Sequence, residues 1–125
     1  MTEEELKSRV KSIALRVIRL VQSLPKNITG EIIGRQLIRS ATSVAANYYS
    51  ACKARSKADF LNKLGIVEEE ADETQFWIEL IIESGLISEN RLQDLLKEFK
   101  EITAIMASSR ITVKSLRRYD PERVG

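Results

Sequence analysis

The stretch LQDLLKEFKEITAIMASSRITVKSL, residues 92–116, decides the fold class. Positions in alternating steps of three and four residues, all but one of them apolar, are occupied by Leu92, Leu95, Phe99, Ile102, Met106, Ser109, Val113 and Leu116. This spacing places one apolar stripe along a helix and is typical of antiparallel helical bundles. The stretch therefore predicts a long helix over about residues 89–118.

The same spacing recurs three times upstream. It predicts further helices over about residues 3–24, 30–53 and 57–83. Pro25 and Gly30 flank the first break, Ser56 with Asp59 resembles a capping box, and Gly85 ends the third helix. No period-two alternation is sustained, so no strand is expected. We predict an all-α, antiparallel up-down-up-down four-helix bundle that forms one domain over residues 1–125.

Composition excludes several classes of protein. The 125 residues are 43% hydrophobic and 30% charged, a balance typical of a globular domain. No apolar run approaches the roughly 20 residues of a membrane span, and the acidic N-terminus does not resemble a signal peptide. The single cysteine, Cys52, fits a reducing cytoplasm. Because histidine is absent, zinc sites and catalytic triads are disfavoured, and we expect no enzymatic activity, no cofactor and no specific metal requirement.

Charge falls into two blocks that the small net charge of +2 conceals. Residues 26–57 have six basic side chains and one acidic, whereas residues 58–84 have eight acidic and one basic. The acidic run at 68–73 points around its helix, so it predicts a solvated or salt-bridged face rather than converging metal ligands. Complementary contact between the second and third helices, within or between subunits, is the simpler explanation of the pattern.

A basic strip is expected on the second helix. Arg35, Arg39 and Lys53 line one edge opposite its core stripe, and Arg117 and Arg118 add positive charge near the C-terminus. One interpretation is an ordinary solvated face. The other is a surface that follows the phosphates of a nucleic acid, without aromatic side chains for stacking on bases.

Several apolar side chains point away from the predicted core. At 100° per residue, Phe76 and Leu80 lie opposite Phe60 and Ile78 on the third helix. These positions are either a wide core stripe or subunit interfaces, and two separate patches favour a head-to-tail ring over a two-fold dimer. The candidate interface residues are Leu15, Ile18, Ile66, Phe76, Trp77 and Leu80.

Two isolated polar positions receive structural interpretations. Asn47 lies at the core edge of the second helix, where a buried amide would fix the packing register. Cys52 is expected to be a small apolar filler.

Two motifs resemble a known family. The segments QLIRSATSVAAN (residues 36–47) and RSKADF (55–60) with KLGIVEEEADET (63–74) are similar to signatures of the four-helix bundle proteins named for 23S ribosomal RNA intervening sequences. With the flanking helices, the resemblance covers essentially the whole chain. Ser50 and Ala51 stand where many members have Glu-Gly, which indicates a variant branch.

The resemblance implies an assembly and a set of partners. Members form bundles that assemble into rings, typically pentameric, and no enzymatic activity or cofactor is implied. The accessory variability determinant proteins of diversity-generating retroelements are similar in architecture, and bind nucleic acid together with a reverse transcriptase.

Two functional interpretations therefore stay open. In the first, the protein is a homo-oligomeric, non-enzymatic binding module for RNA, DNA or a nucleic-acid-associated protein such as a reverse transcriptase. In the second, it is a structural or protein-interaction oligomer without a nucleic-acid role. Neither interpretation involves a membrane.

Overall fold

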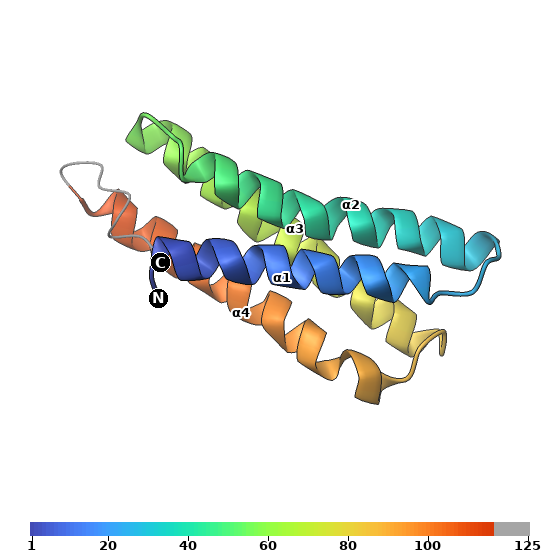
Figure 1. Cartoon of the computed structure of the whole chain (residues 1–125). Helices are drawn as coiled ribbons and strands as arrows, with labels where there is room; N and C mark the ends of the chain where they lie inside the picture. Colours follow the sequence, from blue (N-terminus) through green and yellow to red (C-terminus); the bar gives the residue numbers. More distant parts are fainter. Residues whose placement is uncertain (117–125) are drawn as a thin grey trace.

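Four helices make up the part of the chain that the structure describes. The computed structural model describes residues 1–116, and within them the helices are α1 (Glu3–Gln22), α2 (Ile28–Ala51), α3 (Lys57–Glu83) and α4 (Glu89–Lys114). Consecutive helices run in opposite directions along one bundle (Figure 1). The predicted all-α four-helix bundle is confirmed. None of the described helices is long and apolar enough to cross a membrane.

Side-chain caps set most of the helix starts. Thr2, Asn27 and Ser56 each accept a hydrogen bond from the backbone N–H three residues on, at 3.1, 2.9 and 3.1 Å. The capping role predicted for Ser56 is confirmed. Ser88 occupies the equivalent position before α4, but its hydroxyl makes no such bond. Gly85, with φ of 77°, ends the α3 turn as predicted, because a left-handed backbone favours glycine.

Three predicted boundaries were wrong by two residues. The second helix begins at Ile28 rather than at residue 30, because Asn27 caps it and Gly30 lies inside its first turn. The second helix ends at Ala51 rather than at 53, since the backbone N–H groups of Lys53 and Ala54 bond to carbonyls three residues before them. The first helix ends at Gln22 rather than at 24, since the backbone N–H groups of Ser23 and Leu24 turn back to carbonyls three residues before them. The end predicted at 118 for the fourth helix lies outside the described residues.

The predicted apolar stripes form a single core. Leu6, Leu37, Leu64 and Phe99, one from each helix, are fully buried. Burying such a side chain contributes about 1.5–3 kcal/mol. α1 and α4 are the least closely packed neighbours, whereas α3 packs closely against both α2 and α4. The helices on each diagonal, α1 with α3 and α2 with α4, therefore present their outer faces on opposite sides of the bundle.

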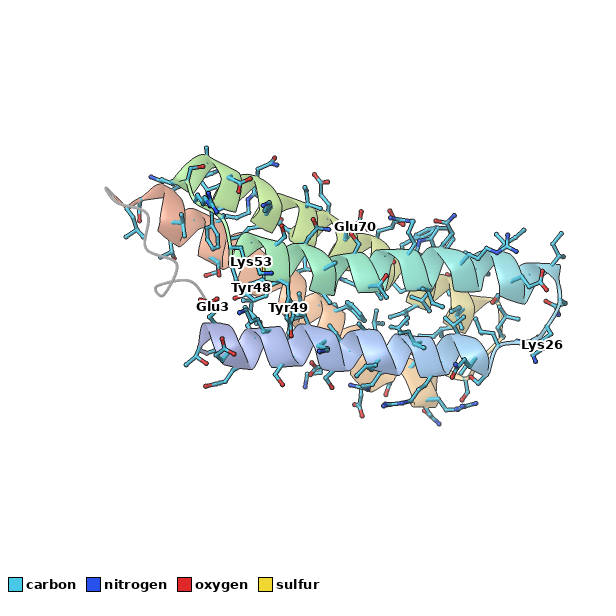
Figure 2. The ribbon with its side chains drawn as sticks, turned by 45° about the horizontal axis from the view of Figure 1, so that its top comes forward. Glu3, Lys26, Tyr48, Tyr49, Lys53 and Glu70 are labelled. Atoms are coloured by element: carbon cyan, nitrogen blue, oxygen red, sulfur yellow. The ribbon has the colours of Figure 1, made fainter. Side chains whose placement is uncertain are left out.

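Two ionisable groups near the C-terminal end of α2 are withdrawn from water. Tyr48 is 1% exposed, and Cys52, half-buried, ends the helix beside it. Burial raises the pKa of Cys52 to about 12 and raises the pKa of Tyr48 well above its ordinary value of 10.0. The thiol thus stays protonated and packs against the core as the filler predicted from the sequence. Tyr48 lies on the side of α2 that faces Glu3 of α1 (Figure 2).

Alkaline pH is therefore expected to destabilise the fold. The unfolded chain releases these protons near its ordinary pKa values of 9.0 and 10.0, while the folded chain retains them. Stability is complete below pH 9 and falls as the pH rises toward 12. Tyr48 alone should account for about 1 kcal/mol by pH 11. Urea unfolding of wild type and Tyr48→Phe across this range measures its share. An equal loss of stability in both proteins would contradict the assignment to Tyr48.

Candidate binding surfaces

The predicted basic strip lies on the outer face of α2. Arg35, Arg39 and Lys53 are all exposed. Arg35 and Arg39 lie about one turn apart on α2, and Lys53 lies two residues past its last residue, Ala51. Lys26 precedes α2 and Lys53 follows it, so cations stand near both ends of the helix (Figure 2). Arg117 and Arg118, the other two members predicted for this surface, lie outside the described residues.

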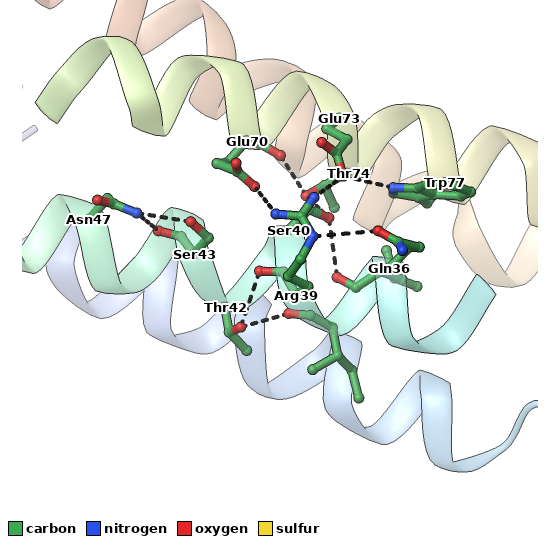
Figure 3. A network of polar contacts seen from close by, with 12 residues as sticks. Gln36, Arg39, Ser40, Thr42, Ser43, Asn47, Glu70, Glu73, Thr74 and Trp77 are labelled. Carbon is green, nitrogen blue, oxygen red and sulfur yellow. Dashed lines mark hydrogen bonds and ion pairs between the residues drawn. The ribbon is translucent and has the colours of Figure 1, made fainter. Parts of the chain in front are cut away.

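Arg39 differs from its neighbours because α3 binds it. Its guanidinium donates from Nη1 to Glu70 at 3.1 Å and from Nη2 to the carboxylate of Glu73. The Trp77 indole N–H donates to the same Glu73 carboxylate at 3.0 Å (Figure 3). The Trp77 hydrogen bond and Arg39 together lower the pKa of Glu73. The complementary contact predicted between the basic and acidic helices is therefore confirmed, within one subunit.

The contact of Arg39 with Glu70 and Glu73, called the Arg39 clamp below, divides the basic strip. Arg39 is already neutralised by two carboxylates, so a phosphate would have to compete with them. Arg35 and Lys53 form no ion pair with any residue among 1–116. The free positive charge of the strip thus lies at its two ends. Arg35 and Lys26 also flank an open, mainly apolar groove of about 420 Å³ between the end of α1 and the start of α2.

The two outward apolar patches have exposed centres and half-buried flanks. Phe76 is 55% exposed and Leu15 is 45% exposed. Phe76 meets the Trp77 ring edge-on, with 4.9 Å between ring centroids. Trp77 and Leu80 pack partly against the core, and Ile18 and Ile66 are also half-buried. Phe76 and Leu15 are thus the members of the predicted interfaces that water reaches most.

Charge around the two patches is opposite in sign. Lys11 lies one helical turn before Leu15 on α1, whereas Asp72 and Glu79 flank Phe76 on α3. None of these three charged side chains has an ion-pair partner in the described chain. Because α1 and α3 are diagonal in the bundle, the two patches face opposite ways. One subunit therefore presents two non-identical apolar patches whose neighbouring charges are opposite in sign.

Three exposed isoleucines were missed in the sequence. Ile28, Ile32 and Ile111 are 73%, 52% and 71% exposed. Ile28 and Ile32 lie four residues apart and form a short apolar pair beside the strip on α2. The 100° projection that identified Phe76 also places both opposite the core stripe of α2, so the signal was present.

The interhelical polar contact is not the one predicted. The amide of Asn47 donates to the carbonyl and hydroxyl oxygens of Ser43, at 2.9 and 2.8 Å, inside its own helix. It does not fix the register between helices. The buried polar contact between α2 and α3 is instead made by Thr74 and Ser40, both fully buried. The Thr74 hydroxyl donates to the Ser40 hydroxyl oxygen at 2.9 Å (Figure 3). Both hydroxyls also hydrogen-bond to backbone carbonyls of their own helices, those of Leu37 and Glu70. Serine and threonine commonly do so within helices, so the sequence alone does not mark these two as an interhelical pair.

The acidic run is largely engaged by arginines. Glu68 pairs with Arg110 at 2.7 Å, and Glu70 and Glu73 bind Arg39. Over residues 1–116, no group of three or more carboxylate or thiol side chains is arranged to hold a metal ion. The run stabilises contacts between helices, as the salt-bridged interpretation predicts.

Fold and surface together describe a small four-helix bundle with exposed charged and apolar faces. The chain belongs to the 23S rRNA-intervening sequence protein family, whose model matches residues 3–108. It is similar to a protein of unknown function from the S23 ribosomal protein family of Bacteroides thetaiotaomicron VPI-5482, known from a crystal structure. The two sequences are 31% identical, with 90% of this chain and 98% of the other covered and a TM-score of 0.80. No protein with a curated description matches the chain.

Proposed function

We propose that the protein is a non-enzymatic, homo-oligomeric module that binds nucleic acid through the phosphates. The subunits join head to tail, with the Phe76 patch of α3 against the Leu15 patch of the next subunit, in a ring for which five copies are expected. The observation that carries the proposal is the pair of free cations, Arg35 and Lys53, on an outer face that neither patch occupies.

Assembly would raise the affinity of the basic strip for nucleic acid. The strip of one subunit has only two cations without an ion pair in the described residues, Arg35 and Lys53, and these release too few counterions for tight binding. A ring built through α1 and α3 leaves the outer face of α2 uncovered and repeats it with the same orientation in every subunit. The number of phosphates contacted, and with it the affinity, then grows with the number of subunits.

The alternative is an oligomer that binds only proteins. The Arg39 clamp favours it, because the central cation of the strip already serves the fold of its own subunit. The exposed side chains of Ile28 and Ile32 would then pack against a protein partner, which suits apolar side chains better than a nucleic-acid backbone does.

Binding of short RNA and DNA, followed by fluorescence anisotropy over a salt series, separates the two. Wild type should bind with little sequence preference, and the logarithm of its affinity should fall with the logarithm of salt concentration by about 0.9 per duplex phosphate contacted. Arg35→Glu/Lys53→Glu should weaken binding at low salt at least about 100-fold, since it removes two favourable charges per subunit and adds two repulsive ones. Arg39→Gln should have a smaller effect, because two carboxylates already neutralise it.

A matched control tests position rather than net charge. Lys97→Glu/Lys100→Glu makes the same change of charge at exposed positions of α4 and should bind much more tightly than the α2 double variant. If both double variants lost the same affinity for nucleic acid, the effect would come from the net charge of the protein and not from the α2 strip. Undiminished binding by the α2 variant would remove the strip from the mechanism, and no binding by assembled wild type at low salt would favour the protein-only alternative.

A further inference from the structure

A pocket lined by arginines lies between the end of α1 and the start of α4. Its volume is about 270 Å³, and its lining consists of Arg16, Arg19, Leu20, Ser23, Arg91, Leu92 and Leu95. The ribbons of α1 and α4 spread apart toward this end of the bundle (Figure 1), in keeping with their loose packing. The pocket lies on the α1–α4 seam, away from the α2 strip and from the Phe76 patch.

Three guanidinium groups meet at this pocket without a carboxylate in its lining. Arg16 is half-buried, and Arg19 and Arg91 are exposed. None of the three forms an ion pair with a residue in the described range, whereas Arg9, Arg39 and Arg110 each do.

The acidic residues nearby along α4 lie outside the lining of this pocket. The nearest, Asp94, follows Arg91 by three residues, is exposed and forms no ion pair within residues 1–116. Glu98 and Glu101 of α4 are held by Arg9, about two turns before Arg16 on α1. Glu89, in the first turn of α4, lines two other pockets on that helix together with Lys100. The negative end of the α1 dipole stabilises a cation in the last turn of the helix, and Arg19 is placed there. This effect explains one of the three arginines but not the other two. Like charges gathered without a counterion favour an anion as the missing partner.

The rest of the lining indicates which anion fits. Leu92 and Leu95, 1% and 4% exposed, form the floor of the pocket, and half-buried Leu20 supplies an apolar wall beside the arginine side chains. Guanidinium groups bind phosphate oxygens in a bidentate fashion, and an apolar wall accepts the face of a base or ribose. The volume falls just below the usual range for small-molecule sites, so it suits one nucleotide rather than a larger cofactor.

We propose that this pocket binds the terminal phosphate of a nucleotide, either free or at the end of a nucleic-acid strand. Arg16 and Arg91 hold the phosphate from the two helices, Arg19 adds charge at the rim, and Leu20 contacts the organic part. Only the second source, a strand end, rests on the proposed function. The pocket lies within one subunit, so binding needs no assembly.

Calorimetric titration with AMP and with adenosine tests the pocket. Wild type should bind AMP, and adenosine, which lacks the phosphate, should bind at least about tenfold more weakly. Arg16→Gln/Arg91→Gln should lower the affinity for AMP at least about tenfold, since it removes two charge-assisted contacts. The matched control Arg35→Gln/Lys53→Gln removes the same charge from the α2 strip and should leave AMP binding unchanged. Thermal melts establish that both variants fold.

Three results would overturn the proposal: no AMP binding by wild type at millimolar concentration, equal affinities for AMP and adenosine, or equal AMP affinities of the pocket variant and the strip variant. The assembly-deficient Phe76→Glu/Leu80→Glu protein should still bind AMP, so failure of the ring leaves this test intact. Oligonucleotides with and without a 5′-phosphate then identify the source. A 5′-phosphate that strengthens binding of wild type but not of Arg16→Gln/Arg91→Gln indicates a strand end, and an equal response of both proteins indicates the free nucleotide.

Discussion

Replacing Phe76 and Leu80 by glutamate is expected to turn an assembled protein into monomers. Each subunit contact would then have to bury two carboxylates in an apolar patch, at a cost of several kcal/mol per ion. The new charges would also lie beside Asp72 and Glu79, which already make this face of α3 acidic. Size-exclusion chromatography with light scattering at micromolar concentration gives the mass directly.

A control and a mixing experiment sharpen this prediction. Ile111→Glu places a charge at an exposed apolar residue of α4 outside both patches and should leave the mass unchanged. Leu15→Glu should also give monomers, because it damages the complementary patch on α1. Mixed together, the Phe76→Glu/Leu80→Glu and Leu15→Glu proteins retain one intact patch of each kind and should form a dimer that grows no further. A monomeric wild type, or a mixture that stays monomeric, would contradict head-to-tail assembly.

The bundle was predictable because its determinants are local and repeated. Stripes such as Leu92, Phe99 and Met106 recur over several turns, and few other arrangements bury all of them. The start of a helix was predicted correctly where its capping side chain was recognised in the sequence, as at Ser56. The start of α2 was missed because Gly30 was taken as a break in the helix, whereas it serves as a small residue inside the first turn.

The surface was predictable only in part, for a geometric reason. Charge blocks indicate that α2 and α3 attract each other, but the pairing of Arg39 with Glu70 and Glu73 depends on the rotation and offset of the two helices. Phe76 points outward as the 100° projection predicts. Trp77, one residue on, is half-buried and donates to Glu73, the carboxylate that also binds Arg39 of α2. The arginine pocket was invisible in sequence, because it joins residues about 70 positions apart that lie on different helices.

Gly30→Ala is expected to destabilise the bundle by about 2–3 kcal/mol, whereas the same substitution at Gly65 should stabilise it by about 0.5–1 kcal/mol. A methyl group on Gly30 would lie 2.0 Å from the carbonyl oxygen of Pro25, a backbone atom that cannot rotate away. The turn between α1 and α2 would have to open, and the hydrogen bond from the Gly30 N–H to Asn27, now 2.9 Å, would weaken with it.

Gly65 supplies the matched comparison because it lies inside α3, away from both ends of the helix, and has room for a methyl group. The nearest atoms would be in the Arg110 guanidinium, at 3.8 Å, an ordinary van der Waals contact. Alanine there improves helix propensity without a clash. Urea unfolding of both variants at neutral pH measures the two effects, and they should have opposite signs. If Gly30→Ala were as stable as wild type, the close approach of Pro25 would not limit this turn, and Asn27 alone would account for the start of α2.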